Sequence, residues 1–501
     1  MQDPAFRYQY RISQSPENGT SRRHSLAGWT VELGEALSLA HLRDRSGVAF
    51  GLLLGIAVDL KGIIIEGDFE PTLPQHFGWP ELEAWIEGIT GRFAVLMNVD
   101  GCVRLYTDAC GMIGAVYDRQ ERRIASSLSL CLRRAVEDHP DYDHSAVAER
   151  GAKYILFDTR DKFVRRMNPS CHLSLNDFQE TRFWPREQSI SLIDGDLGKT
   201  YDWLTAQTEL VVGAIARRHR TWLALSGGQD SRLLLAMAGS AIGDVERCFT
   251  HISNYANRID ATIAARMAEH VGVEHEVHDR KRNKNVPNEI ERDMQEFQRG
   301  AGFAMPAVRE VANGLARRLP KDAIVLRGHQ TDILRAVFST STGANARRKT
   351  AWQVKRLMAV PYAEFNRSIH ERFRPRYENW RLALPDFAEP SSTDLMFLEL
   401  YYSSSLGCVF PALSRNFYMS PFNGRRQIAY AMAIDEAYRR RSFAVFDILY
   451  RIDPELHDIP FDFELGAEIA KINDADHVQA CTKDRRKASA GRASAILGVR
   501  E

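Results

Sequence analysis

The stretch from Leu225 to Arg232 (L-S-G-G-Q-D-S-R) combines residue types that are suited to binding a phosphate group. The apolar run 222–225 and the helical apolar pattern that follows predict a strand, a glycine turn and a helix in succession. Free backbone N–H groups and the positive end of the helix would meet at that turn, which favours an anion there. Gly227 and Gly228 are expected to adopt unusual φ angles, so that the backbone can approach the anion closely.

The polar side chains of this turn refine the prediction. Ser226 and Ser231 would add hydroxyl donors. Asp230 would repel a bare phosphate, so its presence implies a divalent cation between the carboxylate and the phosphate oxygens. The alternative is a glycine turn that only joins a strand to a helix, but that role would give these three side chains no purpose. The Walker pattern G-x-x-x-x-G-K-[ST] is absent from this stretch.

A second β-run meets a glycine at residues 323–332 (A-I-V-L-R-G-H-Q-T-D). Asp332 would supply a second carboxylate, and two carboxylates are the usual protein share of a Mg²⁺ site that also uses substrate phosphates. The alternative role for Asp332 is that of a helix N-cap. His329, with an ordinary pKa of about 6.5, could deprotonate an amine or orient a carboxylate. Its alternative is a loop histidine without a catalytic role.

Alternating strands and helices are expected to position these two strings. Strands are predicted at 247–252 and 273–277, with a helix at 260–270 between them and an amphipathic helix at 196–217 before the glycine turn. This alternation builds a parallel sheet with helices on both faces. Ligands of such sheets bind beyond the carboxyl ends of the strands, which is where the glycine turn would lie.

The chain before residue 190 has a pattern of short strands and turns instead. A hairpin is predicted at Asp100-Gly101, between two β-rich runs. Helices are predicted at 79–89 and 145–152. Layered β-sheets with helices outside are therefore expected. The stretch from Pro185 to Gly195 is polar and loop-like, and the boundary with the rest of the chain is expected near residues 186–196.

The region from about 340 to 480 is predicted to be mainly helical. It contains the basic cluster Arg347-Arg348-Lys349, interpreted as a solvated loop, and Glu399, whose distance from the active site the sequence leaves open. The final stretch, residues 483–501, is basic and rich in small residues, and it is predicted to be a flexible tail.

Composition excludes several classes of function. The chain has 501 residues and a formal net charge of +1, which argues against nucleic acid as a partner. Its seven cysteines form no C-x-x-C pair, which argues against a zinc site and a disulfide framework and fits a reducing compartment. No apolar run approaches the roughly 20 residues of a membrane span, and the first residues lack a signal-peptide pattern. A soluble, cytoplasmic protein without membrane partners is therefore expected.

The S-G-G-x-D-S string at 226–231 is similar to the pyrophosphate loop (PP-loop) of enzymes that cleave ATP between its α and β phosphates, and the whole chain resembles the asparagine synthetase superfamily. The N-terminal strings that carry the resemblance are Gly91-Arg92-Phe93, Tyr106 to Gly111, Arg166 to Pro169 and Arg182 to Trp184. The resemblance implies an α/β protein with two domains and a tail. Residues 1–190 would form a layered, Ntn-hydrolase-like class II glutamine amidotransferase domain. Residues 191–482 would form an asparagine synthetase-like domain with a parallel-sheet PP-loop fold and a helical C-terminal part, and residues 483–501 would form the tail.

The glutaminase chemistry of that superfamily is missing here. It needs an N-terminal cysteine, whose thiolate attacks the glutamine amide while its own α-amine acts as the base. Gln2 follows Met1, and the first cysteine of the chain is Cys102. The N-terminal domain is therefore predicted to be structural. Cys102 and Cys110 are interpreted as core cysteines, with a nucleophile as the disfavoured alternative.

The resemblance also assigns residues around the nucleotide. In that superfamily the end of the second strand recognises adenine, which points to Thr250, His251 and Ile252; an edge histidine with satisfied hydrogen bonds is an equal alternative for His251. The G-H-x-x-D string is similar to that of lasso-peptide cyclases, whereas asparagine synthetases have a glutamate and β-lactam synthetases a tyrosine at the position of His329. Ile333 replaces the second acidic residue of the asparagine synthetase string.

The late lysine that neutralises the departing pyrophosphate in the superfamily is missing where Asp458 to Asp462 stand. Cations that could replace it are Arg232, Arg439, Arg440, Arg441 and Lys471. The residues predicted to bind ATP and its pyrophosphate are Leu225, Ser226, Gly227, Gly228, Gln229, Asp230, Ser231, Arg232, Thr250, His251, Ile252 and Gly328. The residues predicted to be catalytic are His329, Asp230 and Asp332, of which the two aspartates would hold Mg²⁺.

The expected function is that of a carbon–nitrogen ligase that uses ATP and Mg²⁺. A small-molecule or peptide carboxylate would attack the α-phosphate, and an amine would then displace AMP from the acyl-adenylate. Without a glutaminase, intramolecular ring closure of the lasso-peptide type is favoured, with a precursor peptide and its leader-processing protein as partners. Intermolecular ligation and ammonia-dependent asparagine synthesis follow. A non-catalytic ATP-binding scaffold is the alternative of another class, and the absence of paired cysteines disfavours tRNA thiolation.

Overall fold

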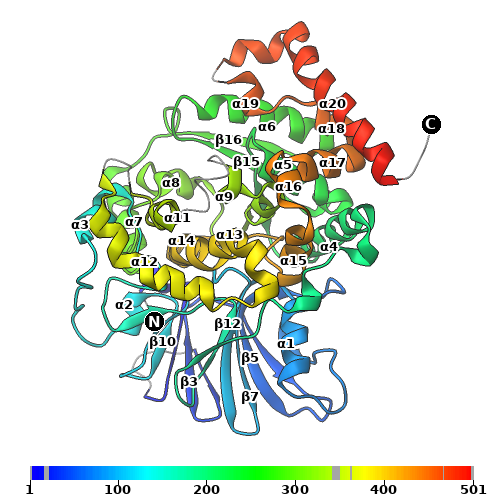
Figure 1. The fold of residues 1–501 in the computed structure, drawn as a ribbon. Helices are drawn as coiled ribbons and strands as arrows, with labels where there is room; N and C mark the ends of the chain where they lie inside the picture. Colours follow the sequence, from blue (N-terminus) through cyan, green and yellow to red (C-terminus); the bar gives the residue numbers. More distant parts are fainter. Residues whose placement is uncertain (1–2, 16–21, 341–349, 361–363, 467, 498–501) are drawn as a thin grey trace.

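The computed structural model describes residues 3–15, 22–340, 350–360, 364–466 and 468–497. The basic cluster at 347–349 and the last four residues of the chain lie outside these ranges. Within them the protein is of mixed α/β type, with two mainly antiparallel sheets, one parallel sheet and a helical C-terminal part (Figure 1). Every helix in the described part of the chain is too short or too polar to span a lipid bilayer.

Short strands build the two N-terminal sheets, as the pattern of strands and turns predicts. In spatial order, the first sheet consists of β11 (Val164–Arg166), β9 (Val116–Asp118), β10 (Arg123–Ala125), β1 (Tyr10–Ser13), β3 (Trp29–Leu33) and β2 (Arg23–Leu26). The second consists of β13 (Glu180–Arg182), β12 (Cys171–Ser174), β8 (Cys102–Thr107), β7 (Thr90–Val99), β5 (Ala49–Val58), β4 (Leu39–Arg43) and β6 (Gly67–Phe69). Neighbouring strands are antiparallel except β4 and β6, which are parallel.

The predicted hairpin joins β7 to β8. Asp100 and Gly101 have φ angles of 51° and 80°, and the residues on either side of them, Val99 and Cys102, are paired across the hairpin. Two positive φ angles in succession match a two-residue turn whose twist suits antiparallel strands. The prediction from the Asp-Gly pair is therefore confirmed.

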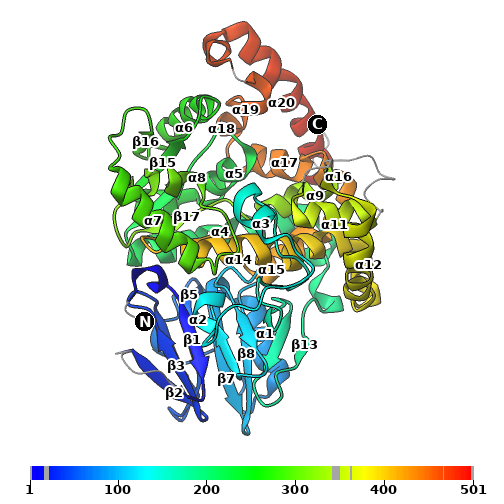
Figure 2. The same ribbon diagram turned by 90° about the vertical axis from the view of Figure 1, so that its left-hand side faces the viewer.

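The two sheets pack as layers, with helices outside them (Figure 2). Ile12 of β1, Leu53 of β5 and Val95 of β7 are all fully buried in one continuous core. The predicted helices at 79–89 and 145–152 correspond to α1 (Trp79–Gly88) and α3 (His144–Arg150). A further short helix, α2 (Leu128–Cys131), lies beside β10.

A five-stranded parallel sheet forms the centre of the second half of the chain (Figure 1). Its strands, in spatial order, are β16 (His275–Asp279), β15 (Arg247–Ile252), β14 (Thr221–Ala224), β17 (Ile324–Leu326) and β18 (Phe417–Met419). The first four correspond to apolar runs that the sequence predicts to be strands. β18 was not predicted, because it lies in the region from about 340 to 480 whose pattern predicts mainly helices.

Helices connect and cover these strands. The predicted helices at 196–217 and 260–270 correspond to α4 (Leu197–Arg218) and α6 (Asn257–Val271). α6 packs against β15 and β16, and α5 (Gln229–Met237) packs against α4 and α17. The other α-helices are α7 (Pro287–Gly300), α8 (Arg309–Ala312), α9 (Val337–Thr340), α11 (Thr350–Met358), α12 (Arg367–Leu382), α13 (Ser392–Leu395), α14 (Ser403–Ala412), α15 (Arg425–Ala433), α16 (Glu436–Arg440), α17 (Phe443–Ile452), α18 (Pro454–Asp458), α19 (Asp462–Leu465) and α20 (Ala475–Leu497).

Two further kinds of helix occur. The 3₁₀ helices are η1 (Pro4–Phe6), η2 (Glu187–Ser189), η3 (Ile193–Gly195), η4 (Gly239–Asp244), η5 (Leu315–Arg318), η6 (Thr331–Arg335), η8 (Asp386–Ser391) and η10 (Ile469–Asn473). A π-helix, η9 (Met396–Tyr402), leads directly into α14. Both η6 and η9 contribute side chains near the pocket described below, and π-helical turns are often found beside functional sites.

Buried polar contacts join the two halves of the chain. Arg92 of β7 donates a hydrogen bond to the carbonyl of Tyr418 (3.1 Å), and its guanidinium lies 4.4 Å from the centre of the Phe417 ring. Asn423 donates a hydrogen bond to the carboxylate of Asp108 (2.9 Å). The strings around Arg92 and Asp108, which carry the resemblance in the N-terminal half, thus anchor β18, the neighbour of β17.

Other polar residues of the N-terminal half and this junction are structural. Glu399 is fully buried and accepts hydrogen bonds from Arg182 (2.6 Å) and Trp380 (2.8 Å), so its carboxylate is already occupied. Cys110 is fully buried, and burial raises the pKa of its thiol well above the ordinary value. Cys102 is half-buried at the start of β8. Cys110 is therefore a core residue, as predicted, whereas Cys102 lies beside the hairpin turn and outside the core.

The basic stretch from residue 483 differs from the prediction of a flexible tail. It is helical as far as residue 497 and forms most of α20, the red helix at the top of Figure 1. Arg485 forms an ion pair with Glu464 (3.0 Å), and Arg492 forms one with Asp447 (2.7 Å). These ion pairs tie α20 to α19 and α17, which the composition of the stretch alone did not indicate.

Candidate active site

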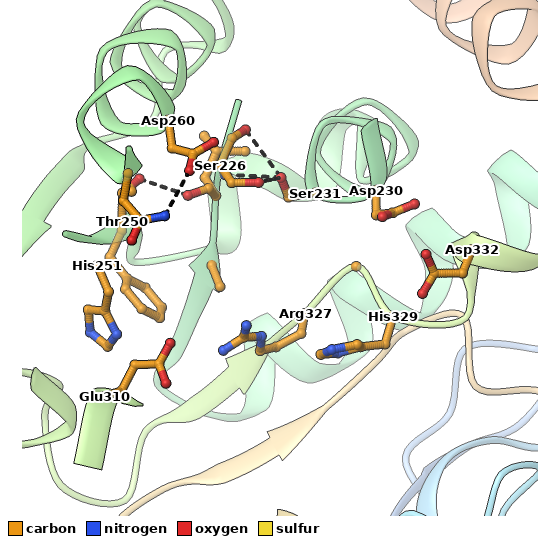
Figure 3. Close-up of a pocket in the computed structure, with 15 residues that line it drawn as sticks. Ser226, Asp230, Ser231, Thr250, His251, Asp260, Glu310, Arg327, His329 and Asp332 are labelled. Atoms are coloured by element: carbon orange, nitrogen blue, oxygen red, sulfur yellow. Dashed lines mark hydrogen bonds between the residues drawn. The ribbon is translucent and has the colours of Figure 1, made fainter. Parts of the chain in front are cut away.

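A pocket with a volume of about 250 Å³ opens beside the carboxyl ends of β14, β15 and β17 (Figure 3). It is lined by Ala224, Leu225, Ser226, Asp230, Ser231, Phe249, Thr250, His251, Asn257, Asp260, Glu310, Arg327, Gly328, His329 and Asp332. Carboxyl ends of parallel strands meet at one edge of a sheet, so segments that are distant in sequence converge there. Nine of the lining residues belong to the predicted site.

The turn after β14 leads directly into α5, which begins at Gln229. Gly228 is the N-cap residue and provides no side-chain cap, so the first N–H groups of α5 remain available to a ligand. The hydroxyl of Ser231 accepts a hydrogen bond from the N–H of Ser226 (3.0 Å) and lies 3.0 Å from the Ser226 hydroxyl. The two serines line the pocket as predicted, but they also hold the turn closed through their contact with each other.

The glycines of the site have different functions. The φ angle of Gly228 is −80° and that of Gly227 is not positive either, so the prediction of unusual φ angles was wrong. A Cβ atom on Gly227 would lie 2.8 Å from the Ile263 side chain, whereas one on Gly228 would meet no atom closer than 3.6 Å. At Gly328 a Cβ would lie 2.5 Å from the carbonyl oxygen of Asp230. Gly328 is therefore required for close packing, whereas the atom nearest to Gly227 is the end of a side chain that can move.

Asp230 and Asp332 lie together at one end of the pocket (Figure 3), and the guanidinium of Arg335 contacts both of them. Arg335 donates two hydrogen bonds to Asp230 (2.9 and 2.5 Å) and one to Asp332 (2.6 Å). Asp332 also accepts a hydrogen bond from the hydroxyl of Tyr402. It lies within the first turn of η6, whose N-cap residue is Gln330, so the alternative role of N-cap does not apply.

The two carboxylates fit a divalent cation in number and in chemistry. Desolvation in the pocket and the neighbouring Asp332 carboxylate raise the pKa of Asp230 to about 8, and a bound cation would oppose that effect. No group of three or more acidic, histidine or cysteine side chains is arranged as a metal site among the described residues. Mg²⁺ would therefore need ligand oxygens from a bound phosphate, and Arg335 would have to leave both carboxylates.

His329 is enclosed in the floor of the pocket, between the aromatic rings of Tyr402 and Phe410. Burial and the nearby Arg327 guanidinium lower the pKa of His329 to about 4, so the imidazole is neutral at pH 7. Its Nδ1 atom is buried without a hydrogen-bond partner. The carbonyl of His329 accepts a hydrogen bond from Ser420 (2.6 Å), which fixes this part of the loop. Because Nδ1 is buried, a ligand in the pocket could reach it only after the imidazole ring turns.

The end of β15 forms the opposite end of the pocket. Thr250 donates a hydrogen bond to the carbonyl of Leu225 (2.7 Å), which joins β15 to the start of the glycine turn. Burial and the nearby His278 lower the pKa of His251 to about 3, and its Nε2 atom has no partner. His251 is therefore not an edge histidine with satisfied hydrogen bonds. Ile252 is buried and lies outside the pocket lining.

Several residues of the predicted binding loop do not reach the pocket. Gly227, Gly228 and Gln229 are absent from its lining, and Gln229 instead accepts a hydrogen bond from Ser442 (3.2 Å). Arg232 is fully buried and lies 3.7 Å above the Phe461 ring. Its guanidinium donates hydrogen bonds to the carbonyls of Leu456, Ile459 and Pro460. Arg232 thus connects α5 to the segment around Asp458 to Asp462, which lacks the late lysine of the superfamily.

The other cations that could replace the missing lysine are also engaged elsewhere. Arg439 is buried and forms an ion pair with Asp394 (2.7 Å), and Lys471 forms one with Glu468 (3.0 Å). Arg440 lies 3.9 Å from Glu436, and the Arg441 guanidinium lies 5.7 Å from the centre of the Phe443 ring. None of these four cations lines the described pocket. The guanidiniums that reach the site are those of Arg327 and Arg335.

The sequence did not reveal several residues of the pocket. Asp260 of α6 accepts a hydrogen bond from the N–H of Gly227 (3.0 Å) and so occupies one donor of the predicted phosphate loop. Glu310 and Arg327 line the pocket toward His251 (Figure 3). Arg327 and Arg335 flank the G-H-x-x-D string, which was a usable signal. Glu310 lies on the four-residue helix α8, which has no period to detect.

The chain was also compared with known proteins. The geometry above supports a ligand site at the end of a parallel sheet, whereas the resemblance to asparagine synthetases depends on the strings of the sequence and remains a prediction. No protein-family model matches the chain, and neither does any curated protein.

Proposed function

We propose that this protein is an ATP- and Mg²⁺-dependent synthetase that converts a carboxylate into an acyl-adenylate and couples it to an amine, releasing pyrophosphate and AMP. One observation carries the proposal: residues from Leu225–Ser231, Thr250–His251 and Gly328–Asp332 line a single pocket at the carboxyl ends of parallel strands. An uncapped helix N-terminus and a pair of carboxylates in one pocket suit a nucleoside triphosphate with a divalent cation.

The polarity of the pocket supports one orientation of the nucleotide. The N-terminus of α5 and the two aspartates lie at one end, which suits the triphosphate. Thr250 and His251 lie at the other end, which suits adenine (Figure 3). Arg327 and His329 lie between the two ends, beside the position that the α-phosphate and the substrate carboxylate would then take.

Each part of the pocket has a role in this reaction. Mg²⁺, when bound, would be held by Asp230 and Asp332 and would withdraw charge from the phosphate oxygens. The N–H groups at the start of α5 would stabilise the charge that develops on the departing pyrophosphate. The neutral imidazole of His329, which lines the pocket, would accept the proton of the attacking amine.

The same reasoning extends to the two halves of the chain. We propose that residues 191–482 form a PP-loop synthetase domain and that residues 1–190 form a degenerate glutaminase-like domain of the Ntn-hydrolase type. The buried, high-pKa thiol of Cys110 supports the loss of glutaminase chemistry, since a nucleophile must be exposed as a thiolate. The amine would then come from the substrate itself, as in macrolactam closure of a peptide, with free ammonia as the alternative source.

The test is ATP–pyrophosphate exchange and AMP release by the purified full-length protein with Mg²⁺. Candidate substrates are a precursor peptide from the same gene neighbourhood and, separately, aspartate with ammonia. Turnover that disappears in Asp230→Ala would support adenylation, and the productive substrate would distinguish ring closure from asparagine synthesis. ATP binding without AMP release under any of these conditions would refute the proposal.

A non-catalytic ATP-binding scaffold is the second candidate, and a specific observation favours it. Arg335 already neutralises the two carboxylates that the reaction needs for its cation, and no lysine reaches the described pocket. A scaffold would bind ATP with the same affinity whether Mg²⁺ is present or removed with a chelator. A synthetase would bind ATP far more weakly after Mg²⁺ is removed.

A further inference from the structure

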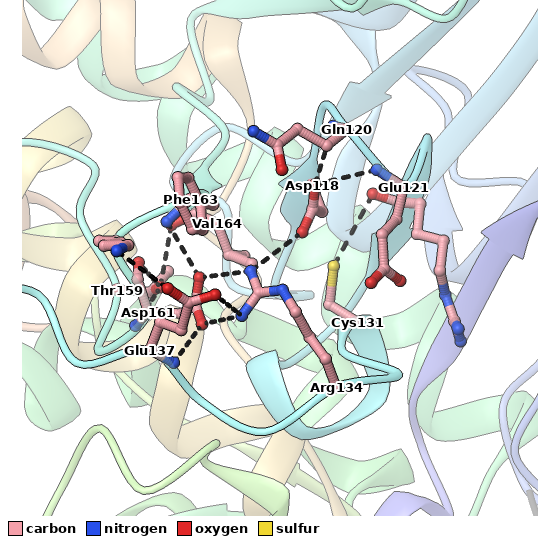
Figure 4. A network of polar contacts seen from close by, with 12 residues as sticks. Asp118, Gln120, Glu121, Cys131, Arg134, Glu137, Thr159, Asp161, Phe163 and Val164 are labelled. Carbon is pink, nitrogen blue, oxygen red and sulfur yellow. Dashed lines mark hydrogen bonds and ion pairs between the residues drawn. The ribbon is translucent and has the colours of Figure 1, made fainter.

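An arginine between two aspartates also occurs in the N-terminal half of the chain, where it is structural (Figure 4). Arg134 contacts Asp161 at 2.6 Å and Asp118 at 3.4 Å. Backbone N–H groups add donors to both carboxylates, from Gln120 to Asp118 (2.8 Å) and from Glu137 to Asp161 (2.9 Å). The two aspartate side chains are only 1% and 0% exposed. The two carboxylates of this cluster are thus closed off from solvent and held by backbone donors as well as by Arg134.

The cluster of Asp230, Asp332 and Arg335 at the pocket differs from it in the exposure and in the hydrogen-bond donors of its carboxylates. The side chains of Asp230 and Asp332 are 29% and 16% exposed, and both line the pocket. No backbone N–H donates to either carboxylate in the described part of the chain; their donors are the side chains of Arg335, Thr331 and Tyr402. Once Arg335 moves away, these carboxylates would have several free lone pairs directed into an accessible pocket.

The pocket also lacks a cation for the phosphate end of a nucleotide. Arg327 points toward Glu310, away from Asp230 and Asp332 (Figure 3). The cations that the sequence suggested are engaged elsewhere, as described above. Arg335 is the cation that already lies at the carboxylate pair, with a 23% exposed side chain. A guanidinium binds carboxylate and phosphate with the same planar set of donors, so it can exchange one for the other without losing hydrogen bonds.

We propose that Arg335 is a displaceable counter-cation: it holds Asp230 and Asp332 together in the nucleotide-free protein and moves to the pyrophosphate oxygens when a divalent cation takes its place. The cation therefore binds only together with a pyrophosphate group. This inference rests on the proposed function for the identity of the phosphate ligand. It does not depend on turnover, because both halves of the exchange are binding events.

The first measurement is a titration of the full-length protein with Mn²⁺ alone. The electron paramagnetic resonance signal of free Mn²⁺ reports how much of the ion is bound. Wild-type protein is expected to bind Mn²⁺ at least about tenfold more weakly than Arg335→Gln, in which the two carboxylates lose their counter-ion. Equal Mn²⁺ affinity of the two proteins would overturn the proposal.

The second measurement is calorimetric titration with inorganic pyrophosphate in excess Mg²⁺. Arg335→Gln is expected to bind Mg-pyrophosphate at least about tenfold more weakly than wild type, because it lacks the cation that would reach the phosphate oxygens. Arg335→Lys keeps the positive charge but loses the planar set of guanidinium donors, so its affinity for Mg-pyrophosphate should lie between those of wild type and Arg335→Gln. If Arg335→Gln does not fold, Arg335→Lys replaces it in both measurements. Unchanged pyrophosphate affinity in the variants would overturn the proposal.

The N-terminal cluster supplies a matched control. Arg134→Gln should lower the melting temperature without creating a Mn²⁺ site, since backbone N–H groups still bind both carboxylates. A Mn²⁺ site of equal affinity in Arg134→Gln would contradict the distinction between the clusters. If the wild-type protein releases no AMP but the Mn²⁺ and pyrophosphate measurements give the expected results, the proposed function is refuted and the role of Arg335 is retained.

Discussion

Replacing Gly328 by alanine should disrupt the active site through a backbone clash. The added Cβ would lie 2.5 Å from the carbonyl oxygen of Asp230 and 2.9 Å from the N–H nitrogen of Ser231. Real Cβ atoms essentially never come closer than 3.0 Å to such atoms, so the loop after β17 and the first turn of α5 must move apart. Backbone atoms cannot rotate away as a flexible side chain can, and the displacement therefore reaches both halves of the pocket.

The expected cost follows from this geometry. Overpacking a closely packed position costs about 1–3 kcal/mol of unfolding free energy, and a misplacement of about 1 Å at a reacting centre can cost about 100-fold in rate. Gly328→Ala should therefore lose about 1–3 kcal/mol in urea denaturation and lose most of its AMP release. The loss of activity should exceed what the remaining folded fraction explains, because Asp230 and His329 are displaced relative to each other.

Two other glycines provide controls for Gly328→Ala. A Cβ on Gly228 would meet no atom closer than 3.6 Å, and one on Gly243 would meet none within 4 Å. Gly243→Ala should change the unfolding free energy by less than about 0.5 kcal/mol. Gly228→Ala should cost at most about 1 kcal/mol, since alanine is only a poorer N-cap. If Gly328→Ala is as stable as Gly243→Ala, the close contact between the loop and α5 is not real and the reasoning fails.

Three further predictions test the titrating and buried groups. The pKa of Asp230 is raised to about 8, and a cation binds only the ionised carboxylate. The affinity for Mg-pyrophosphate should therefore rise by up to about tenfold per pH unit below pH 8 and level off above it. Calorimetry should find no such rise in Asp230→Asn. Because the pKa of His329 is lowered to about 4, the rate of AMP release should show no inflection from this group near pH 6.5. His329→Gln should release AMP about 100- to 10,000-fold more slowly than wild type. A loss of rate below about tenfold would exclude a role of His329 as base. Arg232→Met removes donors from three backbone carbonyls and should cost about 2–4 kcal/mol in urea denaturation; a cost below about 1 kcal/mol would contradict its structural role.

The sequence predicted the framework of the site because the framework depends on local patterns. Apolar runs that end at a glycine located β14 and β17, and the alternation of strands and helices predicted a parallel sheet. Since the carboxyl ends of such strands share an edge, Ser226, Thr250 and His329 could be expected in one place, and all three line the pocket. β18 escaped prediction because it lies in a region whose pattern predicts helices, and α8 because four residues are too few to display a helical period.

The partners of the predicted side chains could not be foreseen, because they depend on how distant segments approach each other. Arg232 lies in the predicted phosphate loop, yet its guanidinium is directed to carbonyls more than 200 residues further along the chain. Asp230 was predicted to bind a cation, and the cation in place is a guanidinium three residues beyond Asp332. Gly227 and Gly228 were singled out for unusual φ angles that they do not adopt, whereas Gly328 has a steric function, because it makes room for the first turn of α5.

The charges around the pocket explain why a phosphate ligand would need to arrive with a cation. Four carboxylates line the pocket, on Asp230, Asp260, Glu310 and Asp332, whereas Arg327 is the one arginine or lysine in its described lining. Arg335 adds a second guanidinium, but both of its contacts go to Asp230 and Asp332. A bare triphosphate would therefore enter a site with an excess of negative charge, which the helix N-terminus with its partial charge of roughly half a unit cannot offset. A divalent cation supplies the missing charge and at the same time frees Arg335 for the phosphate, so the two binding events should be strongly coupled.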